Sequence, residues 1–376
     1  MSLKPPRSGA IVSSILDQCD VRIGGDRDQD IVVHDAAMFR RVLRDGSLGL
    51  GESYMDGQWD CARVDRFVEN LLTHRDRYSL RRGVKEWLFD VLSAAVNFQT
   101  RMRSLTVGRQ HYDVGNDLYQ TMLDPYMMYS CAYWNGKQTL NDAQLLKLEM
   151  ICQKLQLAPG MRLLDIGCGW GGMAHYAAEH YGVEVVGVTI SREQQKLARE
   201  RCKDYPIDIR FQDYRDLDGK FDRIVSIGMF EHVGYKNYRT YFSKCHELLA
   251  DEGLFLLHTI GSNITTKNGD PWLTKYIFPH GMLPSISQLG GASEGLLVME
   301  DWHNLGSDYD RTLMAWYNNI KDRWDEFGGR YDQRFRRMWE YYLLSCAGVF
   351  RSRYSQLWQM VFSKGARKLR YDRPCL

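Results

Sequence analysis

Four side chains that lie far apart in the sequence are the candidates for chemistry: Cys131, Glu231, His258 and Tyr309. Glu231, in GMFEHVG, follows the fourth strand that we expect in a repeated strand and helix pattern, and His258, in FLLHTIG, lies on the fifth. Both should therefore face the crevice above the sheet, where ligands of doubly wound folds bind. Either residue alone could instead be a buried structural residue, and together they indicate a catalytic site.

Cys131 lies in MMYSCAYW, where two methionines and three aromatic rings surround one thiol. Such a thiol could be a nucleophile, a metal ligand or part of the core. The nine cysteines of the chain are odd in number, scattered and without a CxxC pair, so neither a disulfide framework nor a structural zinc site is expected. We predict no metal site.

The turn in LDIGCGWGG, between a predicted strand and a predicted helix, indicates a cofactor site. Its Gly167, Gly169 and Gly172 satisfy GxGxxG, which alone is a weak dinucleotide signal. A nicotinamide cofactor would also need an acid at the end of the second strand to bind the ribose, and Thr189 stands there instead. The nicotinamide cofactor is therefore disfavoured, and a tight turn without any ligand is the alternative interpretation.

The same turn fits (D/E)xGxGxG and so resembles the first motif of S-adenosylmethionine methyltransferases; the matching residues are Asp165, Gly167, Gly169 and Gly171. Glycines let the amino acid end of that cofactor approach the backbone, because no side chain is in the way. Without a ribose acid the pocket must be completed by other residues, and we expect these to be Thr189, Gln194, Asp213 and Tyr214. Tyr214 could equally be a core residue.

Strands and helices alternate in the part of the chain that must position these residues. We predict strands in RLLDIGCG, VEVVGVTI, IDIRFQD, FDRIVSIGM and GLFLLHTIG, and helices from Gly171, from Ser191 and through YRTYFSKCHELLADEG. Ser191 and Gln194 form a capping box at the start of the second helix. LWQMVFSKG predicts a closing strand, for which we consider an antiparallel orientation. The alternation predicts an α/β fold with a mostly parallel, doubly wound sheet covered on both faces.

The sequence divides into three predicted segments: a small mixed N-terminal domain (1–83), a basic amphipathic helix with a linker (84–110) and a catalytic domain (111–376). Within the last segment, the alternation lapses into a Pro- and Gly-punctuated insertion at 262–296. Insertions after the carboxyl ends of strands usually build substrate lids, so we predict a substrate lid there.

The overall composition is that of an ordinary globular protein, with 26% charged and 44% hydrophobic residues. A net charge of +2 is too small to argue for a nucleic-acid partner. We find no apolar run long enough to span a membrane and no convincing signal peptide, so we expect a cytoplasmic protein. From Arg75 to Arg109, however, the sequence contains eight basic and only three acidic residues, and its apolar residues recur at helical spacing. Such a helix could lie on an anionic bilayer or pack on its own protein.

Nine motifs together resemble the cyclopropane-fatty-acyl-phospholipid synthase family, in the order usual for that family: GSLGLGESYMDG, HYDVGNDLY, MYSCAYW, LDIGCGWGG, VGVTIS, GMFEHVG, LLHTIG, DPWLTKYIFP and LMAWY. The resemblance covers nearly the whole chain, whereas the shorter mycolic acid cyclopropane synthases resemble only the part from about His111 onward. It implies the class I S-adenosylmethionine methyltransferase fold, which is Rossmann-like.

The resemblance implies transfer of the methyl group of S-adenosylmethionine to a cis double bond of an unsaturated phospholipid acyl chain. The alkene is the nucleophile, and loss of a proton from the new methyl group closes a cyclopropane ring. Aromatic faces stabilise the intermediate carbocation by roughly 0.5 to 2 kcal/mol each, and Tyr129, Tyr133 and Trp134 are available for this. Tyr129 and Ser130 are also expected to border the cofactor.

The family further implies that a bound bicarbonate ion removes the proton. Its implied contacts are Cys131, largely through its backbone, together with Glu231, His258, Ile260 and Tyr309. An anion beside a carboxyl group would raise the pKa of that carboxyl by like-charge repulsion, which we expect at Glu231. Cys346, in LLSCAGVF, resembles a cysteine formerly regarded as the family nucleophile. Its apolar helix favours structural core, and we keep it as a weak catalytic candidate.

Because the acyl chain lies in a bilayer, the resemblance favours peripheral membrane association, transiently at the inner face of the membrane. We expect the basic helix and the N-terminal domain (1–83), as a lipid-binding or helper domain, to contact anionic lipid. The candidate membrane-binding residues are Arg77, Arg81, Arg82, Lys85 and Trp87. The family also suggests a homodimer. Two alternatives remain: an alkene methyltransferase that yields branched or hydroxylated chains, and a non-catalytic lipid-binding protein with a degenerate methyltransferase fold. The second predicts a damaged cofactor turn or a missing Glu, His or Tyr, and none is missing.

Overall fold

The computed structural model describes residues 7–77, 115–365 and 370–374 of the 376-residue chain. The chain forms two compact units. The first comprises Met1–Leu92, Asn268–Pro279 and Tyr309–Ser355, and the second comprises Ser93–Lys267, His280–Asp308 and Gln356–Leu376. The predicted catalytic domain (111–376) is thus divided between the two units. Part of its predicted lid (268–279) and a later segment (309–355) belong to the first unit.

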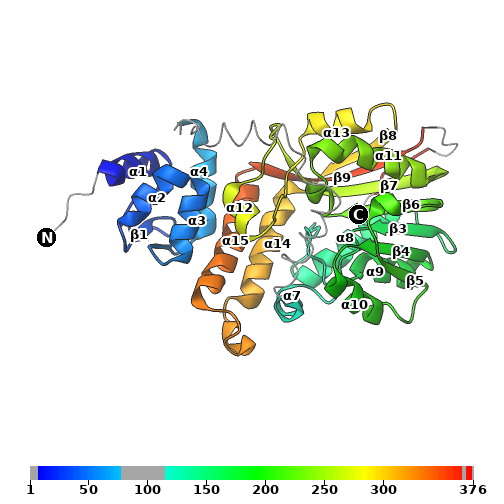
Figure 1. Ribbon diagram of the computed structural model, residues 1–376, viewed down its shortest axis with the longest axis horizontal. Helices are drawn as coiled ribbons and strands as arrows, with labels where there is room; N and C mark the ends of the chain where they lie inside the picture. The colour runs from blue at the N-terminus through cyan, green and yellow to red at the C-terminus, as the bar shows by residue number, and fades with distance from the viewer. Residues whose placement is uncertain (1–6, 78–114, 366–369, 375–376) are drawn as a thin grey trace. The chain divides into compact units, whose positions relative to one another are not determined.

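The first unit is mainly helical. Its helices are α1 (Arg7–Gln18), α2 (Ala37–Asp45), α3 (Ser47–Met55), α4 (Val64–Thr73), α12 (Pro271–Tyr276), most of α14 (Gly306–Ile320) and α15 (Gln333–Arg351), with the 3-10 turns η1 (Arg75–Arg77) and η5 (Trp324–Phe327). Strands β1 (Ile31–Val33) and β2 (Trp59–Cys61) form a small antiparallel sheet. Figure 1 labels the helices of this unit and β1, and its colours follow the residue number.

Aromatic packing and one close helix approach hold the first unit together. The buried ring of Trp59 lies 5.1 Å from Tyr54 and 5.2 Å from Phe67, centroid to centroid. On α15, a Cβ at Gly348 would collide with the carbonyl group of Asp65 on α4, so the approach of the two helices requires glycine. The C-terminal stretch of the chain therefore shares a core with the N-terminal helices, which the sequence pattern did not indicate.

The second unit is built on a seven-stranded sheet with the order β5-β4-β3-β6-β7-β9-β8. The strands are β3 (Arg162–Ile166), β4 (Glu184–Thr189), β5 (Ile207–Phe211), β6 (Phe221–Ile227), β7 (Leu249–Ser262), β8 (Val298–Asn304) and β9 (Ser355–Ser363). Strands β3 to β7 pair in parallel, whereas β8 and β9 are antiparallel. The predicted mostly parallel α/β sheet and the antiparallel closing strand are therefore confirmed.

Helices cover both faces of this sheet, as Figure 1 shows. The helices of the unit are α7 (Asn116–Met122), α8 (Leu140–Lys154), α9 (Gly172–Tyr181), α10 (Arg192–Arg201), α11 (Tyr238–Leu248) and α13 (Ile286–Ser293), with short turns η2 (Tyr214–Asp216), η3 (Phe230–His232) and η4 (Tyr235–Asn237). Apolar side chains of α8 and α9 pack on one face, and those of α11 and α13 pack on the other. None of the described helices is both long and apolar enough to cross a bilayer.

The strand order places the crevice of the fold. Strand β3 has β4 on one side and β6 on the other: the chain runs from β3 outward through β4 to β5 and then crosses back to β6, so the strand order reverses at β3. A crevice forms at such a switch point, outside the carboxyl ends of the strands. The glycine-rich turn follows β3 and Glu231 follows β6, so the fold brings the predicted cofactor turn and a predicted catalytic residue to one edge of the sheet.

Candidate functional site

The glycine turn after β3 has the geometry of a cradle. Gly167 and Gly169 adopt φ angles of +82° and +55°, in the left-handed region that favours glycine. A Cβ added at Gly169 would meet no atom within 4 Å, so the backbone there faces open space. Just before the turn, Asp165 is buried, and burial raises the pKa of its carboxyl to about 7. One of its oxygens, Oδ2, has no hydrogen-bond partner among the described residues. The open backbone at Gly169 and the carboxyl oxygen of Asp165 without a partner suit a ligand that carries hydrogen-bonding groups.

The end of β4 carries a polar group in place of the missing ribose acid. The hydroxyl of Thr189 donates to Oε1 of Gln194 at 2.9 Å and accepts from the backbone N–H of Ser191 at 3.1 Å. Ser191 Oγ in turn accepts from the backbone N–H of Gln194 and so caps α10. The predicted capping box is incomplete, because the N–H of Ser191 donates to Thr189 and not to the side chain of Gln194. Because Thr189 engages the amide oxygen, the amide nitrogen of Gln194 is the part that can donate to a sugar hydroxyl.

The predicted adenine contacts after β5 are held by their own loop. The carboxylate of Asp213 caps η2 through the N–H of Arg215 and pairs with the guanidinium of that residue at 2.6 Å. The ring of Tyr214 packs edge-on against Tyr241, with centroids 5.2 Å apart. The proposed contacts of Asp213 and Tyr214 with a cofactor stay predictions.

The segment around Cys131 lies beside the end of β6, because a Cβ at Gly228 would stand 3.9 Å from that of Ser130. The Ser130 hydroxyl accepts a hydrogen bond from Nζ of Lys147 at 3.1 Å. Cys131 is fully buried, and its thiol donates to the carbonyl of Ala132 at 3.2 Å. The Tyr129 ring is partly exposed and meets Tyr119 edge-on at 5.2 Å.

Glu231 is buried in η3 with one engaged oxygen. The backbone N–H of Ile260 on β7 donates to Oε1 at 2.7 Å, whereas Oε2 has no partner among the residues described. Burial raises the pKa of Glu231 to about 7. Burial thus raises this pKa in the protein without ligand, and the further rise expected from a neighbouring anion stays a prediction. The N–H of Ile260, which we expected to contact bicarbonate, is here engaged by Glu231.

His258 lies two residues before Ile260 on β7 and is fully buried. Its Nδ1 lies 3.1 Å from Nε2 of Gln359 on β9, and its own Nε2 has no partner among the described residues. Burial holds the pKa of His258 well below its ordinary value, and the charges of Lys147 and Lys154 lower it further. The ring is therefore neutral at physiological pH.

Three polar residues of this region were missed in the sequence: Lys147 and Lys154 of α8, and Gln359. Burial lowers the pKa of each lysine to about 8. Lys154 lies 3.1 Å from Asp301 and 3.2 Å from Nδ1 of His303. The signal was present, because Lys147 falls between apolar residues at helical spacing and must therefore share their buried face.

Tyr309 and Cys346 belong to the first unit, whereas the other catalytic candidates belong to the second. The Tyr309 ring packs against Phe350 with centroids 4.5 Å apart. Burial raises the pKa of the Cys346 thiol to about 12, so this thiol is protonated at neutral pH and poorly suited to nucleophilic attack. The membership of Tyr309 in the catalytic site stays a prediction. Arg77 lies in η1, and the other four predicted membrane-binding residues lie outside the described residues.

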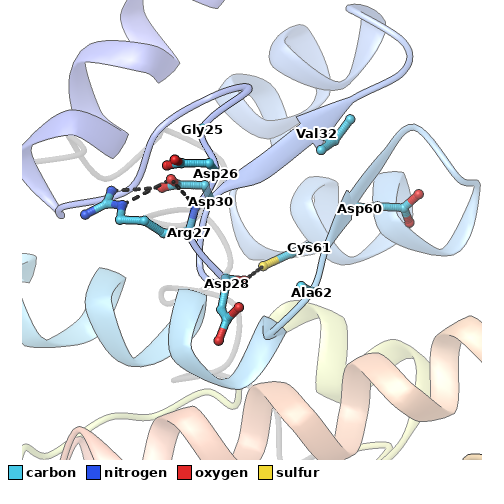
Figure 2. Close-up of a pocket in the computed structure, with 9 residues that line it drawn as sticks. All are labelled: Gly25, Asp26, Arg27, Asp28, Asp30, Val32, Asp60, Cys61 and Ala62. Atoms are coloured by element: carbon cyan, nitrogen blue, oxygen red, sulfur yellow. Dashed lines mark hydrogen bonds and ion pairs between the residues drawn. The ribbon is translucent and has the colours of Figure 1, made fainter.

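A separate pocket of about 220 Å³ lies in the first unit (Figure 2). Acidic residues line much of it, but most are already paired. Asp30 pairs with Arg27 at 2.8 Å, and Asp28 pairs with Arg66 at 3.2 Å. Because these carboxylates already have partners within the unit, we interpret their ion pairs as contacts that stabilise the loop around the pocket. None of the predicted site residues lines this pocket.

Comparison with known proteins identifies the family. The family model described as mycolic acid cyclopropane synthetase matches residues 99–360. A curated relative from Escherichia coli strain K12, cyclopropane-fatty-acyl-phospholipid synthase, is 55% identical over 355 residues, which is 94% of this chain and 93% of the relative. This chain belongs to the cyclopropane synthase family. The matched residues include every catalytic candidate named above, among them Tyr309 and Cys346.

Two further relatives of this cyclopropane synthase family member bear on its chemistry. A solved mycolic acid cyclopropane synthase, CmaA1, complexed with SAH and CTAB, is 32% identical with a TM-score of 0.64, and the alignment covers 69% of this chain and 98% of that one. A probable fatty acid methyltransferase from Pseudomonas putida is 38% identical over 70% of each chain. The predicted methyltransferase fold is confirmed, and the family contains proteins named for more than one product.

Proposed function

We propose that this chain methylates a cis double bond of an unsaturated phospholipid acyl chain and closes a cyclopropane ring there. The match to the Escherichia coli synthase over nearly the full length of both chains supports the substrate class. The observation that carries the chemistry is the pair of buried polar atoms, Glu231 Oε2 and His258 Nε2, that have no partner among the described residues. Such atoms in a crevice indicate a site that binds a ligand.

S-adenosylmethionine, when bound, supplies an electrophilic methyl group. The residues of the second unit fit this cofactor, because the turn offers open backbone at Gly169 and Gln194 offers an amide donor near the ribose position. At Gly167 a Cβ would collide with the side chain of Met229, so that position requires glycine. The carboxyl of Asp165 is buried near the end of β3, just before the turn, and one of its oxygens has no partner among the described residues. We assign Tyr129 and Ser130 to the border of the same pocket.

In the proposed reaction the alkene carbon forms a bond to the methyl carbon while the bond from that carbon to sulfur breaks, leaving a carbocation on the acyl chain. Loss of a proton from the new methyl group then closes the ring, so that the net products are the thioether, the cyclopropane and one proton. The aromatic rings of Tyr129, Tyr133 and Trp134 can each stabilise the cation by roughly 0.5 to 2 kcal/mol. The region must also exclude water, which would trap the cation as an alcohol, and the 262–296 segment is our candidate for the lid.

A bound bicarbonate is our proposed proton acceptor. A Glu231 carboxyl whose pKa is about 7 is largely neutral below that pH, so it can donate a hydrogen bond to an anion instead of repelling it. His258 offers the second contact and Cys131 a backbone contact. Because Ile260 donates to Glu231, we assign Ile260 first to holding that carboxyl in place. Tyr309 completes the proposed set.

Product analysis tests this function. Purified protein is incubated with S-adenosylmethionine and vesicles of a monounsaturated phospholipid, with and without added bicarbonate, and the lipid is analysed by mass spectrometry. A gain of one methylene group with loss of the olefin is the expected result, and bicarbonate should increase its rate. A methylated olefin, a saturated branched chain or a hydroxylated chain would refute ring closure and favour the alternative, an alkene methyltransferase that yields branched or hydroxylated chains.

We also propose that the protein is a cytoplasmic enzyme that binds transiently to the surface of the bilayer. We propose that it acts as a homodimer. The substrate class supports membrane association, since the double bond lies within a lipid leaflet. The basic residues between Arg75 and Arg109 are the candidate contact with anionic headgroups.

A further inference from the structure

Gln359 and His258 share one face of the central sheet. Side chains alternate along a strand, and Leu254 and Leu256 on β7 pack in the cluster formed with α8 and α9, which places His258 on the same face. Val361 on β9 packs in that cluster too, so Gln359, two residues earlier, also faces it. Both His258 and Gln359 are fully buried. A polar pair therefore crosses from β7 to β9 on the face of the sheet that α8 and α9 cover.

The contact between the two side chains determines which ring nitrogen of His258 carries hydrogen. Nε2 of Gln359 lies 3.1 Å from Nδ1 of His258, and an amide nitrogen can only donate. Nδ1 must therefore accept, and a neutral ring then carries its hydrogen on Nε2. Nε2 is the atom that has no partner among the described residues. The amide of Gln359 thus occupies Nδ1 of His258, and the N–H at Nε2 stays available to donate to a ligand.

The charges around the ring oppose a second proton. Lys147 and Lys154 approach from α8, and both lower the pKa of His258. His303 on β8 stands opposite Gln359 in the strand register and accepts from the ammonium of Lys154, so it adds no positive charge of its own. Glu231, which follows β6, contacts β7 through the N–H of Ile260, and burial favours its neutral form. No group in this set favours an imidazolium ion.

We propose that Gln359 is a positioning residue, which fixes His258 as the neutral Nε2–H tautomer so that His258 donates a hydrogen bond to an anionic ligand and does not act as the base. The role of that donor rests on the proposed function, whereas the tautomer is a property of the protein without ligand. Proton removal is then left to the bound anion, since a protonated Nε2 has no lone pair to offer.

Nitrogen NMR of the wild-type protein tests the tautomer without any assay of activity. The protein is labelled with ¹⁵N-histidine, and long-range proton–nitrogen correlations distinguish protonated from unprotonated ring nitrogens. The His258 signals are assigned by their absence in His258→Gln. We expect an unprotonated Nδ1 and a protonated Nε2 at neutral pH. A protonated Nδ1 would overturn the proposal, because the amide of Gln359 would then present its oxygen to the ring.

Two variants test the consequence for catalysis. Gln359→Leu keeps the volume but removes the donor, and Gln359→Glu replaces the donor with an acceptor that should draw hydrogen to Nδ1. We expect both to lower kcat by about 10- to 100-fold, by analogy with the loss when the hydrogen-bond partner of a metal-ligating histidine is removed, with unchanged affinity for S-adenosylmethionine by calorimetry. In Gln359→Glu the Nδ1 signal should also become that of a protonated nitrogen.

Gln356→Leu is the matched control. Gln356 is buried on the same strand, but it lies an odd number of residues away, on the opposite face, and its amide oxygen accepts from Asn304 at 3.1 Å. The control should keep the His258 tautomer and most of the activity. An equal loss of activity in Gln356→Leu, or full activity in Gln359→Leu, would contradict a positioning role. If wild type shows the expected tautomer but makes no cyclopropane, the proposed function fails while the tautomer assignment stands.

Discussion

The buried carboxyl of Glu231 gives a quantitative prediction for stability. Burial raises its pKa from the ordinary 4.5 to about 7. Below about pH 4.5 the group is protonated in both the folded and the unfolded protein. Between that pH and about 7 the folded protein holds a proton that the unfolded chain has released, so stability falls as the pH rises. Above about pH 7 the folded state bears the full penalty of a buried charge.

At about 1.4 kcal/mol for each pH unit between the two pKa values, the penalty amounts to about 3 kcal/mol. Glu231→Gln removes it, because an amide does not ionise and can still accept from the N–H of Ile260. We therefore expect the variant to gain about 3 kcal/mol relative to wild type between about pH 4.5 and about pH 8. Its catalytic activity should fall over the same range, because Glu231 is a proposed contact of the anion.

Urea denaturation of both proteins at several pH values measures the difference in unfolding free energy. Glu149→Gln is the control, because Glu149 has the opposite shift. Burial raises its pKa, but hydrogen bonds from Tyr181, Gln153 and Tyr176 outweigh burial and lower it overall. That variant should lose stability relative to wild type as the pH rises through the normal range of a carboxyl group. A Glu231→Gln effect that is the same at low and high pH would refute the reasoning, since it would show that the carboxyl is not held neutral by burial.

Three further outcomes follow from the structure. Cys131→Ala should retain measurable turnover, because the alkene is the nucleophile and the Cys131 thiol donates to a neighbouring carbonyl; complete inactivity in a protein that folds and binds cofactor would contradict this. Gly348→Ala should destabilise the first unit by roughly 1 to 3 kcal/mol through overpacking against Asp65, as thermal unfolding would show, and an unchanged midpoint would exclude a tight contact there. Charge reversal at four basic residues should weaken binding to anionic vesicles in a sedimentation assay, with neutral vesicles as the control; the residues are Arg77, Arg81, Arg82 and Lys85. Unchanged binding would show that these residues do not contact the membrane.

Much of the second unit could be predicted because its signals are local. Strands β3 to β7 are runs of apolar residues, since a parallel sheet is buried on both faces, and glycines mark the turn after β3. Helix α10 begins at the expected serine cap. Strand β8 was not predicted, and of α15 only an apolar helix around Cys346 was expected, without its bounds or its partners. Their neighbours come from distant parts of the chain, β9 for the strand and α3 and α4 for the helix, and no short-range pattern specifies such partners.

The sequence by itself determined the residue types of the site, the cofactor turn and the family, because motifs and strand patterns are properties of neighbouring residues. It could not determine protonation. Glu231 becomes largely neutral below pH 7, and His258 loses its affinity for a second proton, because the fold removes both from water and places two lysines of α8 near the imidazole. It also could not show that Gln359, 101 residues after His258, donates to that ring. Burial and contacts between distant residues arise when the chain packs, and the tertiary structure alone decided them.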